Sequence, residues 1–215
     1  MANSIKATFY FDYISPYAYL MWRRLNDENR EFSSRLDLRY RPVLFAGLLN
    51  HWEHKGPAEI AAKRIFTYQH AVWLGKKMNI PLNMPPAHPF NPLKALRLTI
   101  ALENDMSLIG QIFNYIWKHG LSLDDENSWN TFTSDLNIKN AEKLSTQDEV
   151  KNTPRLNTED AINAGVFGVP TIIANGHLFW GVDATDMYLE YWKNPNFFDE
   201  EQMKKIDKLP QAARR

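Results

Sequence analysis

The 215-residue sequence contains no cysteine, and this absence removes a whole class of chemistry. Disulfide exchange needs a thiolate on the protein, because the ionised sulfur is the attacking group. The chain therefore cannot exchange disulfides by itself, and any thiol in its chemistry must come from a small molecule. A lack of cysteine is compatible with a reducing compartment, and we expect a cytoplasmic protein.

Excess charge and long apolar segments are missing as well. The 25 basic and 25 acidic side chains cancel, so net charge recruits neither nucleic acid nor an anionic membrane. No apolar stretch approaches the roughly 20 residues of a membrane span, and the first residues do not resemble a secretory signal. We therefore expect no nucleic-acid or membrane partner. The 44% of hydrophobic residues suffices for one substantial core, with room for an inserted subdomain.

The N-terminal region predicts a strand, a helix and a second strand. An apolar run predicts a strand over residues 5–12. The Ser15-Pro16 pair that follows is typical of a helix start, because serine caps helices well and proline suits the first helical position. We expect this helix over residues 16–29. Alternating residues 36–44 predict the second strand, which completes a βαβ unit.

The middle of the chain, residues 45–165, predicts helices and few strands. Its clearest helical stretches cover residues 58–78, 92–104 and 108–119. Prolines cluster after the first of these stretches and predict an extended connection, since proline removes a helical hydrogen bond. We interpret the whole region as a helical insertion.

The C-terminal region predicts a hairpin and a final helix. A tight turn at residues 167–171 leads into a β-hairpin over residues 171–180, whose central Asn-Gly pair is a favoured two-residue turn. A last helix is expected over residues 184–192. We expect the residues from 208 onward to be frayed.

Six segments share their order and approximate spacing with one known family. They are residues 11–20, 41–47, 63–64, 90–97, 165–171 and 179–183. In these segments the chain resembles 2-hydroxychromene-2-carboxylate isomerases, relatives of the kappa-class glutathione transferases in the DsbA-like thioredoxin superfamily. The resemblance covers nearly the whole chain. It implies an α/β, thioredoxin-like fold with a large all-helical insertion, a glutathione cofactor and a homodimer.

The same resemblance divides the chain into two parts. Residues 1–44 and 166–215 would form the thioredoxin-like domain, and residues 45–165 would form the helical insertion subdomain. The reactive turn and the proline loop would then both belong to the thioredoxin-like domain.

Glutathione contacts are assigned by the resemblance to five residues. Ser15 matches the serine that hydrogen-bonds the glutathione sulfur and favours its thiolate, which makes it the catalytic residue. Val169 and Pro170 match a cis-proline loop whose backbone pairs with the cysteinyl part of the ligand. Asp183 matches the acid that meets the γ-glutamyl ammonium, and Lys63 matches a lysine that binds the glycine end.

Each of these residues also has a purely structural alternative. Ser15 would cap the first helix in any case, and that role is compatible with a sulfur contact. The bond between Val169 and Pro170 would be trans in an ordinary turn. Asp183 would cap the last helix, and Lys63 would be a solvated residue on a helix surface.

Candidate substrate-binding residues are Arg41, His54, Phe90 and Asn91. Arg41 would meet a substrate carboxylate, although its position also suits a strand end. His54 stands near a family asparagine, and Phe90 would add to an apolar wall for an aromatic ring. Although His51 and His54 have a helical spacing, nothing completes a ligand set, so we expect no metal site.

Departures from the family pattern at His54, Ala184 and Val182 leave the substrate open. Ala184 stands where relatives commonly have arginine, and Val182 lacks the hydroxyl of kappa-class relatives. Both positions flank Asp183, so its placement is also affected.

The resemblance implies a specific reaction on a small aromatic carboxylate. Glutathione thiolate would add reversibly to 2-hydroxychromene-2-carboxylate or its opened cis form and turn a double bond into a single bond. Rotation and elimination would then give the trans benzylidenepyruvate and regenerate glutathione, a step in aromatic-compound catabolism. Two alternatives stay open: a kappa-like transferase or peroxidase that consumes glutathione, and a non-catalytic thiol-binding module.

Overall fold

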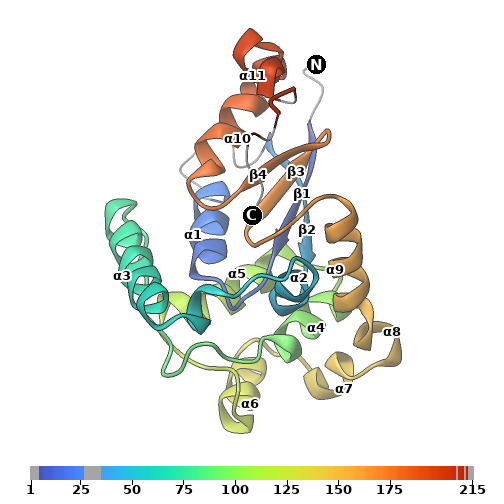
Figure 1. Ribbon diagram of the computed structural model, residues 1–215. Helices are drawn as coiled ribbons and strands as arrows, with labels where there is room; N and C mark the ends of the chain where they lie inside the picture. The colour runs from blue at the N-terminus through green and yellow to red at the C-terminus, as the bar shows by residue number, and fades with distance from the viewer. Residues whose placement is uncertain (1–4, 27–34, 207, 211, 213–215) are drawn as a thin grey trace.

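A four-stranded sheet forms the centre of the computed structural model, which describes residues 5–26, 35–206, 208–210 and 212 (Figure 1). The strands are β1 (Lys6–Phe11), β2 (Asp37–Pro42), β3 (Thr171–Ala174) and β4 (His177–Trp180). They lie in the order β2-β1-β3-β4, where β1 pairs in parallel with β2 and antiparallel with β3, and β3 pairs antiparallel with β4. The expected α/β, thioredoxin-like fold is confirmed.

Helix α1 (Pro16–Leu25) connects β1 with β2 and starts at the predicted serine-proline pair. It ends earlier than predicted, because the side chain of Asn26 turns back to donate to the Trp22 carbonyl at 2.9 Å. Residues 27–29 of the predicted helix lie outside the described residues. The second strand stops at Pro42, before the predicted residue 44, since the chain turns there into the next helix.

Between β2 and β3, the regular elements of the described residues are all helical. They are α2 (Phe45–His51), the 3₁₀-helix η2 (Pro57–Glu59), α3 (Ala61–Lys77), α4 (Leu93–Ala101), α5 (Met106–Phe113), the π-helix η3 (Asn114–Lys118), α6 (Glu126–Asp135), α7 (Ala141–Ser145), α8 (Asp148–Lys151) and α9 (Thr153–Asn163). The proline-rich connection between α3 and α4 contains no helix or strand, as predicted.

The predicted boundaries of these helices shift for local reasons. The stretch 58–78 is divided at Ile60, whose backbone is extended. Helix α4 stops at Ala101 because Glu103 and Asn104 adopt positive φ angles of 56° and 59°. Helix α5 begins before residue 108, since the Asp105 side chain caps it by accepting from the Leu108 N–H at 2.8 Å.

The insertion and the sheet share one hydrophobic core. Phe113 at the end of α5 packs against Phe11, Tyr13 and Trp22, with ring centroids 5.6, 4.8 and 5.9 Å apart. A Cβ atom at Gly110 would approach the Trp22 ring to 2.5 Å, so only glycine permits this packing. The insertion therefore packs against the turn after β1 and supports it.

The C-terminal hairpin has the predicted strands and the predicted turn. Asn175 and Gly176 adopt φ angles of 49° and 83°, as a type I′ turn requires. Helix α10 (Ala184–Lys193) follows as expected, whereas η4 (Phe197–Asp199) and α11 (Glu201–Ile206) were not predicted. Several of the residues expected to fray lie outside the described residues.

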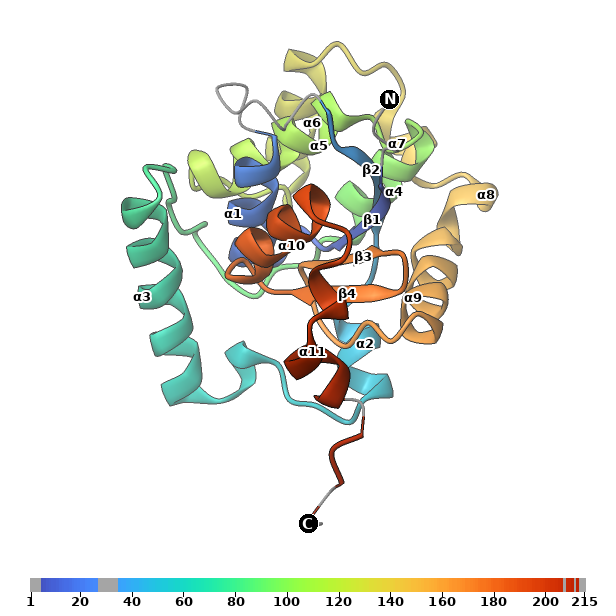
Figure 2. The ribbon, with the colours of Figure 1, turned by 90° about the horizontal axis from the view of Figure 1, so that it is seen from above.

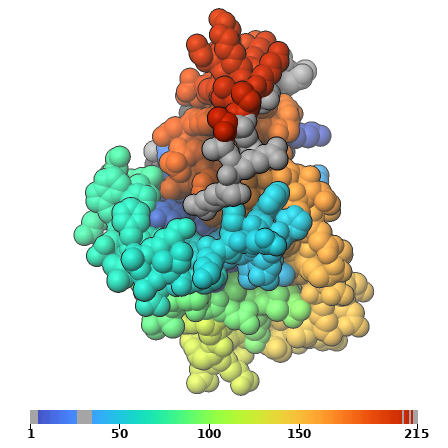
Figure 3. All heavy atoms as spheres, viewed as in Figure 1, coloured from blue at the N-terminus to red at the C-terminus, as the bar shows by residue number. Residues whose placement is uncertain are grey.

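The helices are arranged around the sheet in a way that exposes α3. Helices α1 and α10 contact each other beside the sheet, α9 contacts β2, and α3 stands at the outer side of α1 (Figure 2). A recess between α3 and the C-terminal segments shows N-terminal atoms at its base (Figure 3). Within the described part of the chain, no helix is long and apolar enough to cross a membrane.

Candidate functional site

The two motifs singled out in the sequence meet at Ser15. The Ser15 hydroxyl oxygen accepts a hydrogen bond from the Ala18 N–H at 3.2 Å and so caps α1. The same hydroxyl donates to the Val169 carbonyl at 3.5 Å, across 154 residues of sequence. That second contact is at the outer limit of a hydrogen bond. The hydroxyl proton is therefore held weakly and can turn to a better acceptor.

The Val169–Pro170 peptide bond is cis, as the resemblance implies. The loop is fixed on both sides, because the Thr171 hydroxyl donates to the Gly168 carbonyl at 2.7 Å and the Gly181 N–H donates to the Pro170 carbonyl at 2.9 Å. Among the described residues, nothing accepts a hydrogen bond from the Val169 N–H. This donor is available to the backbone of a ligand.

The start of α1 is suited to an anion. The Tyr17 N–H makes no hydrogen bond within the described residues, and the first turn of the ten-residue helix carries no acidic side chain. Free N–H groups and the positive end of the helix dipole both favour negative charge. The Ser15 hydroxyl adds an O–H donor at the same place.

Asp183 lies directly before α10, and its charge acts on Tyr17 in the first turn of α1. Burial is the main cause of the raised pKa of the Tyr17 hydroxyl, and the Asp183 carboxylate adds to it. The side chain folds back over Gly181, where a Cβ atom would lie 2.6 Å from Asp183 Oδ1. Although Asp183 precedes α10, its side chain makes no capping hydrogen bond. The carboxylate is exposed and has no ion-pair partner among the described residues, so it can meet a cationic group.

Lys63 lies on the exposed surface of α3 and has no ion-pair partner among the described residues. The helix is connected to the start of α1 through Tyr17, whose hydroxyl lies 3.0 Å from His70 Nδ1 and 3.3 Å from the Thr67 carbonyl. Lys63 and His70 are separated by two helical turns and share one side of α3. Lys63 therefore lies on the same side of α3 as His70, the residue that meets the Tyr17 hydroxyl.

The candidate substrate residues are placed in three different ways. Arg41 forms an ion pair with Asp160 at 3.0 Å, so its charge already has a partner. His54 is exposed after α2. Phe90 is half-buried beside Trp117, and the Asn91 side chain accepts from the Leu93 N–H at 3.0 Å at the start of α4.

Two titratable residues next to Ser15 were not among the predicted site residues. Asp12 is 2% exposed, and its carboxylate accepts from the N–H groups of Ile14 at 3.1 Å and Phe45 at 2.9 Å. Burial raises its pKa to about 7. His88, from the proline-rich connection, contacts the Ile14 carbonyl at 2.8 Å. A signal existed only for Asp12, because aspartate often bonds the backbone two residues onward.

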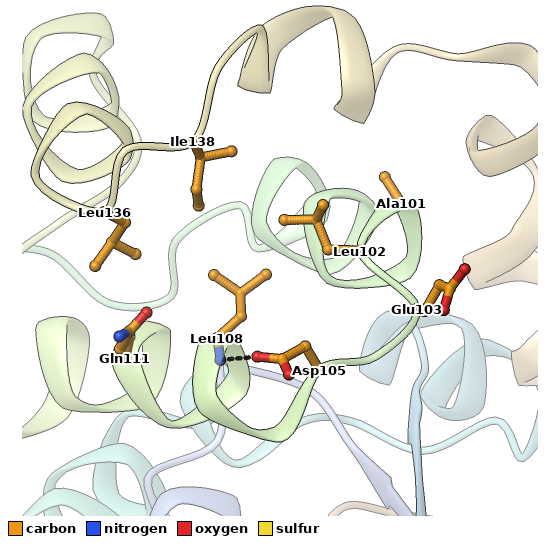
Figure 4. A pocket seen from close by; sticks show the side chains of 8 residues that line it. All are labelled: Ala101, Leu102, Glu103, Asp105, Leu108, Gln111, Leu136 and Ile138. Atoms are coloured by element: carbon orange, nitrogen blue, oxygen red, sulfur yellow. Dashed lines mark hydrogen bonds between the residues drawn. The ribbon is translucent and has the colours of Figure 1, made fainter.

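Another feature of the described surface is a hollow that lies away from the predicted site residues. A surface hollow of about 440 Å³ lies between the end of α4, the start of α5 and the loop after α6 (Figure 4). Its lining is mainly aliphatic and includes none of the predicted site residues. No three histidine or acidic side chains gather as metal ligands within the described ranges.

Comparisons with known proteins agree with this architecture. The family model of the DSBA-like thioredoxin domain matches residues 7–193. Glutathione S-transferase kappa 2 of Caenorhabditis elegans is 27% identical over 192 residues, covering 82% of this chain and 84% of the relative. A 2-hydroxychromene-2-carboxylate isomerase of Sphingobium xenophagum is 25% identical over 193 residues, covering 85% and 95%. A solved 2-hydroxychromene-2-carboxylate isomerase shares the fold with a TM-score of 0.77 at 20% identity, covering 96% of this chain and 100% of that one.

Proposed function

The chain belongs to the DSBA-like thioredoxin domain family, and we propose that it is a glutathione-dependent isomerase. Its reaction would interconvert 2-hydroxychromene-2-carboxylate and trans-o-hydroxybenzylidenepyruvate, or a related aromatic-degradation intermediate. The observation that carries the proposal is the meeting of the Ser15 hydroxyl with the cis-Pro170 loop in a chain that has no cysteine. Relatives named as isomerase and as kappa glutathione transferase, similar over most of their length, support the reaction type and the cofactor.

The donor groups around Ser15 fit a thiolate ligand. The weakly held Ser15 proton and the free N–H of Tyr17 would donate toward the sulfur, while the free N–H of Val169 would bond to the ligand's backbone. Asp183 would hold the γ-glutamyl ammonium, and Lys63 would hold the glycine carboxylate. The two ends of glutathione would thus be held by opposite charges, one directly before α10 and one on α3.

The protein's part in the chemistry is to keep the sulfur ionised and oriented. Bound glutathione would supply a nucleophile that adds reversibly to the conjugated substrate, so that a double bond becomes a rotatable single bond. The Ser15 hydroxyl and the first N–H groups of α1 stabilise negative charge at that point, which lowers a thiol pKa. Since the Ser15 N–H is already bonded to the Asp12 carbonyl at 3.1 Å, the turn is organised before any ligand arrives.

The substrate in this proposal is a small aromatic carboxylate. Phe90 offers part of a ring surface next to the Ser15 turn, because it packs on His88, which contacts that turn. Asn91 and His54 would provide polar contacts. Arg41 is the weakest candidate for the carboxylate, since Asp160 already neutralises much of its charge.

A glutathione-dependent ultraviolet assay on 2-hydroxychromene-2-carboxylate tests the proposal. We expect turnover only with reduced glutathione, and total free glutathione should stay constant through many turnovers. Accumulation of a glutathione conjugate would instead identify a kappa-like transferase, the second candidate that the 27% identical relative favours. Saturable glutathione binding without turnover of either kind would identify a thiol-binding module.

We also propose a homodimer. Helix α3 exposes large apolar side chains: Ile65 is 58% exposed, Phe66 64% and Trp73 52%. Exposed apolar surface of this kind is typical of protein interfaces. Light scattering should give twice the 25.1 kDa chain mass at micromolar concentration, whereas the monomer mass would reject the proposal.

A cytoplasmic location follows from the proposed cofactor. Cytoplasmic thiols are kept reduced, and a glutathione-dependent isomerase needs the reduced form. Cell fractionation should therefore find the protein with cytoplasmic markers, and enrichment in another compartment would contradict this expectation.

A further inference from the structure

Two side chains of the helical insertion bond to the turn that carries Ser15. The indole N–H of Trp117 donates to the Tyr13 carbonyl at 2.8 Å, across 104 residues of sequence. His88 Nε2 lies 2.8 Å from the Ile14 carbonyl, across 74 residues. These carbonyls belong to the two residues directly before Ser15. The turn is therefore held in part by groups from outside the thioredoxin-like segments.

The hydrogen bonds of His88 define where its ring proton lies. A carbonyl oxygen only accepts, so Nε2 carries the proton and Nδ1 of the neutral ring is an acceptor. The Tyr68 hydroxyl, on α3, lies 2.6 Å from Nδ1 and donates to it; the same hydroxyl lies 3.1 Å from the His88 carbonyl. A continuous path of hydrogen bonds thus connects α3 with the Ile14 carbonyl.

Ring packing fixes the His88 imidazole in this orientation. Its centroid lies 5.1 Å from that of Tyr68, 5.7 Å from that of Phe90 and 5.6 Å from that of Trp117. Aromatic rings at these separations make favourable edge-to-face contacts. The N–H that meets the Ile14 carbonyl is consequently in place before a ligand binds.

We propose that His88 is a positioning residue for the thiolate site. It holds the Ile14 carbonyl in place. It thereby fixes the directions in which the Ser15 hydroxyl and the free Tyr17 N–H point. The inference rests on the proposed function, because these two donors matter as partners of a sulfur. Through Tyr68 the same path reaches α3, the helix that carries Lys63, so it connects two parts of the proposed glutathione site.

Four variants separate positioning from general packing. His88→Leu removes both the ring and its N–H, whereas His88→Gln keeps an amide N–H that can reach the Ile14 carbonyl. Tyr68→Phe removes only the hydroxyl that orients the imidazole. His177→Leu is the matched control, because His177 is also a packed histidine, stacked 3.9 Å from Phe198 at the far end of the hairpin.

The first readout needs no ligand. Backbone amide NMR signals of Ser15, Tyr17 and Ala18 should shift in His88→Leu, return toward wild-type positions in His88→Gln and stay unchanged in His177→Leu. Unchanged signals in a folded His88→Leu protein would overturn the proposal, whatever reaction the protein catalyses. Shifts as predicted in a protein that never uses glutathione would refute the proposed function alone.

The second readout is catalytic. His88→Leu should lower kcat by about tenfold to a hundredfold and raise the pKa of the bound thiol, with little change in KM for glutathione, because misplaced donors act on the sulfur and not on the ligand's ends. His88→Gln should recover most of the loss, and Tyr68→Phe should show a smaller loss of the same kind. Wild-type kcat in His88→Leu, or an equal loss in His177→Leu, would overturn the proposal.

Discussion

The two sides of the candidate site are built in different ways. On the Ser15 side, the turn is buried and is bonded by the Asp12 carboxylate and by His88. On the α3 side, Lys63 has no ion-pair partner within the described residues and Phe66 is 64% exposed. The difference teaches that the groups proposed to meet a sulfur are fixed by the fold itself. The groups proposed to meet the ligand's outer parts stand in solvent, where we expect them to affect binding alone.

The largest expected effect is on stability, and it concerns Asp12 on the buried Ser15 side of the site. Burial raises the pKa of Asp12 to about 7 from 3.8, although the N–H groups of Phe45 and Ile14 favour its charged form. An unfolded aspartate titrates near its ordinary pKa, so the protonated carboxyl stabilises the fold below about pH 4. That contribution is lost as the pH rises to about 7.

Asp12→Asn should remove this pH dependence. We expect the free energy of unfolding of the wild type, relative to Asp12→Asn, to fall by up to about 4 kcal/mol between about pH 4 and about pH 7. Denaturant unfolding of both proteins at each pH measures the difference. If the difference is constant over this range, Asp12 titrates normally, and water reaches its carboxylate more easily than its 2% exposure implies.

Ser15→Ala should lower turnover by about a hundredfold to a thousandfold, since one donor to an anion typically contributes about 2.7–4 kcal/mol to catalysis. Glutathione affinity should change little. Loss of the α1 cap should cost about 1 kcal/mol of stability, so unfolding is measured before the kinetics. Ser145→Ala, which removes a buried hydroxyl bonded to the Glu142 carbonyl, is the matched control. Undiminished turnover in folded Ser15→Ala would show that Ser15 only caps α1.

Asp183→Ala should weaken glutathione binding and leave kcat at saturating glutathione nearly unchanged. A hydrogen bond to a charged group contributes about 1.5–3 kcal/mol, or roughly tenfold to a hundredfold in Kd. Asp186→Ala is the control, because that carboxylate, in the first turn of α10, is already paired with Arg24. A glutathione analogue without the amino group should bind both Asp183→Ala and the wild type with similar, reduced affinity. Equal Kd values for glutathione in Asp183→Ala and the wild type would remove Asp183 from the site.

The smallest effect is expected at Lys63, on the exposed side. Solvated ion pairs contribute about 0.2–1 kcal/mol, so Lys63→Ala should raise the Kd for glutathione by at most about fivefold, and added salt should abolish the difference. Arg41→Ala is the matched control, since Arg41 pairs with Asp160. Calorimetric titration at low and high salt measures both variants. An effect larger for Arg41→Ala than for Lys63→Ala would reverse the assignment.

Local signals in the sequence predicted the fold well. The hairpin turn at Asn175 and Gly176 and the helix start at Ser15 and Pro16 depend on neighbouring residues alone, and both are confirmed. Helix ends were less accurate: α4 stops early where Glu103 turns left-handed, which no periodic pattern reveals.

The contacts that hold the Ser15 turn could not be predicted in this way. Asp12 bonds to a backbone group 33 residues away, and His88 bonds to one 74 residues away. Periodicity reports which face of an element is buried, but it does not report which distant element covers it. A histidine in a proline-rich connection carries no local mark of such a partner.

A titration of glutathione that follows the ultraviolet absorbance of its thiolate tests the central claim most directly. The claim is that Ser15, the start of α1 and the cis-Pro170 loop together form a site for an ionised thiol. Wild-type protein should bind glutathione saturably and ionise its sulfur at a pKa well below the ordinary thiol value of about 8.5, and Ser15→Ala should raise that pKa. Absence of saturable binding at millimolar glutathione, or a bound thiol with an unshifted pKa in wild-type protein, would contradict the account.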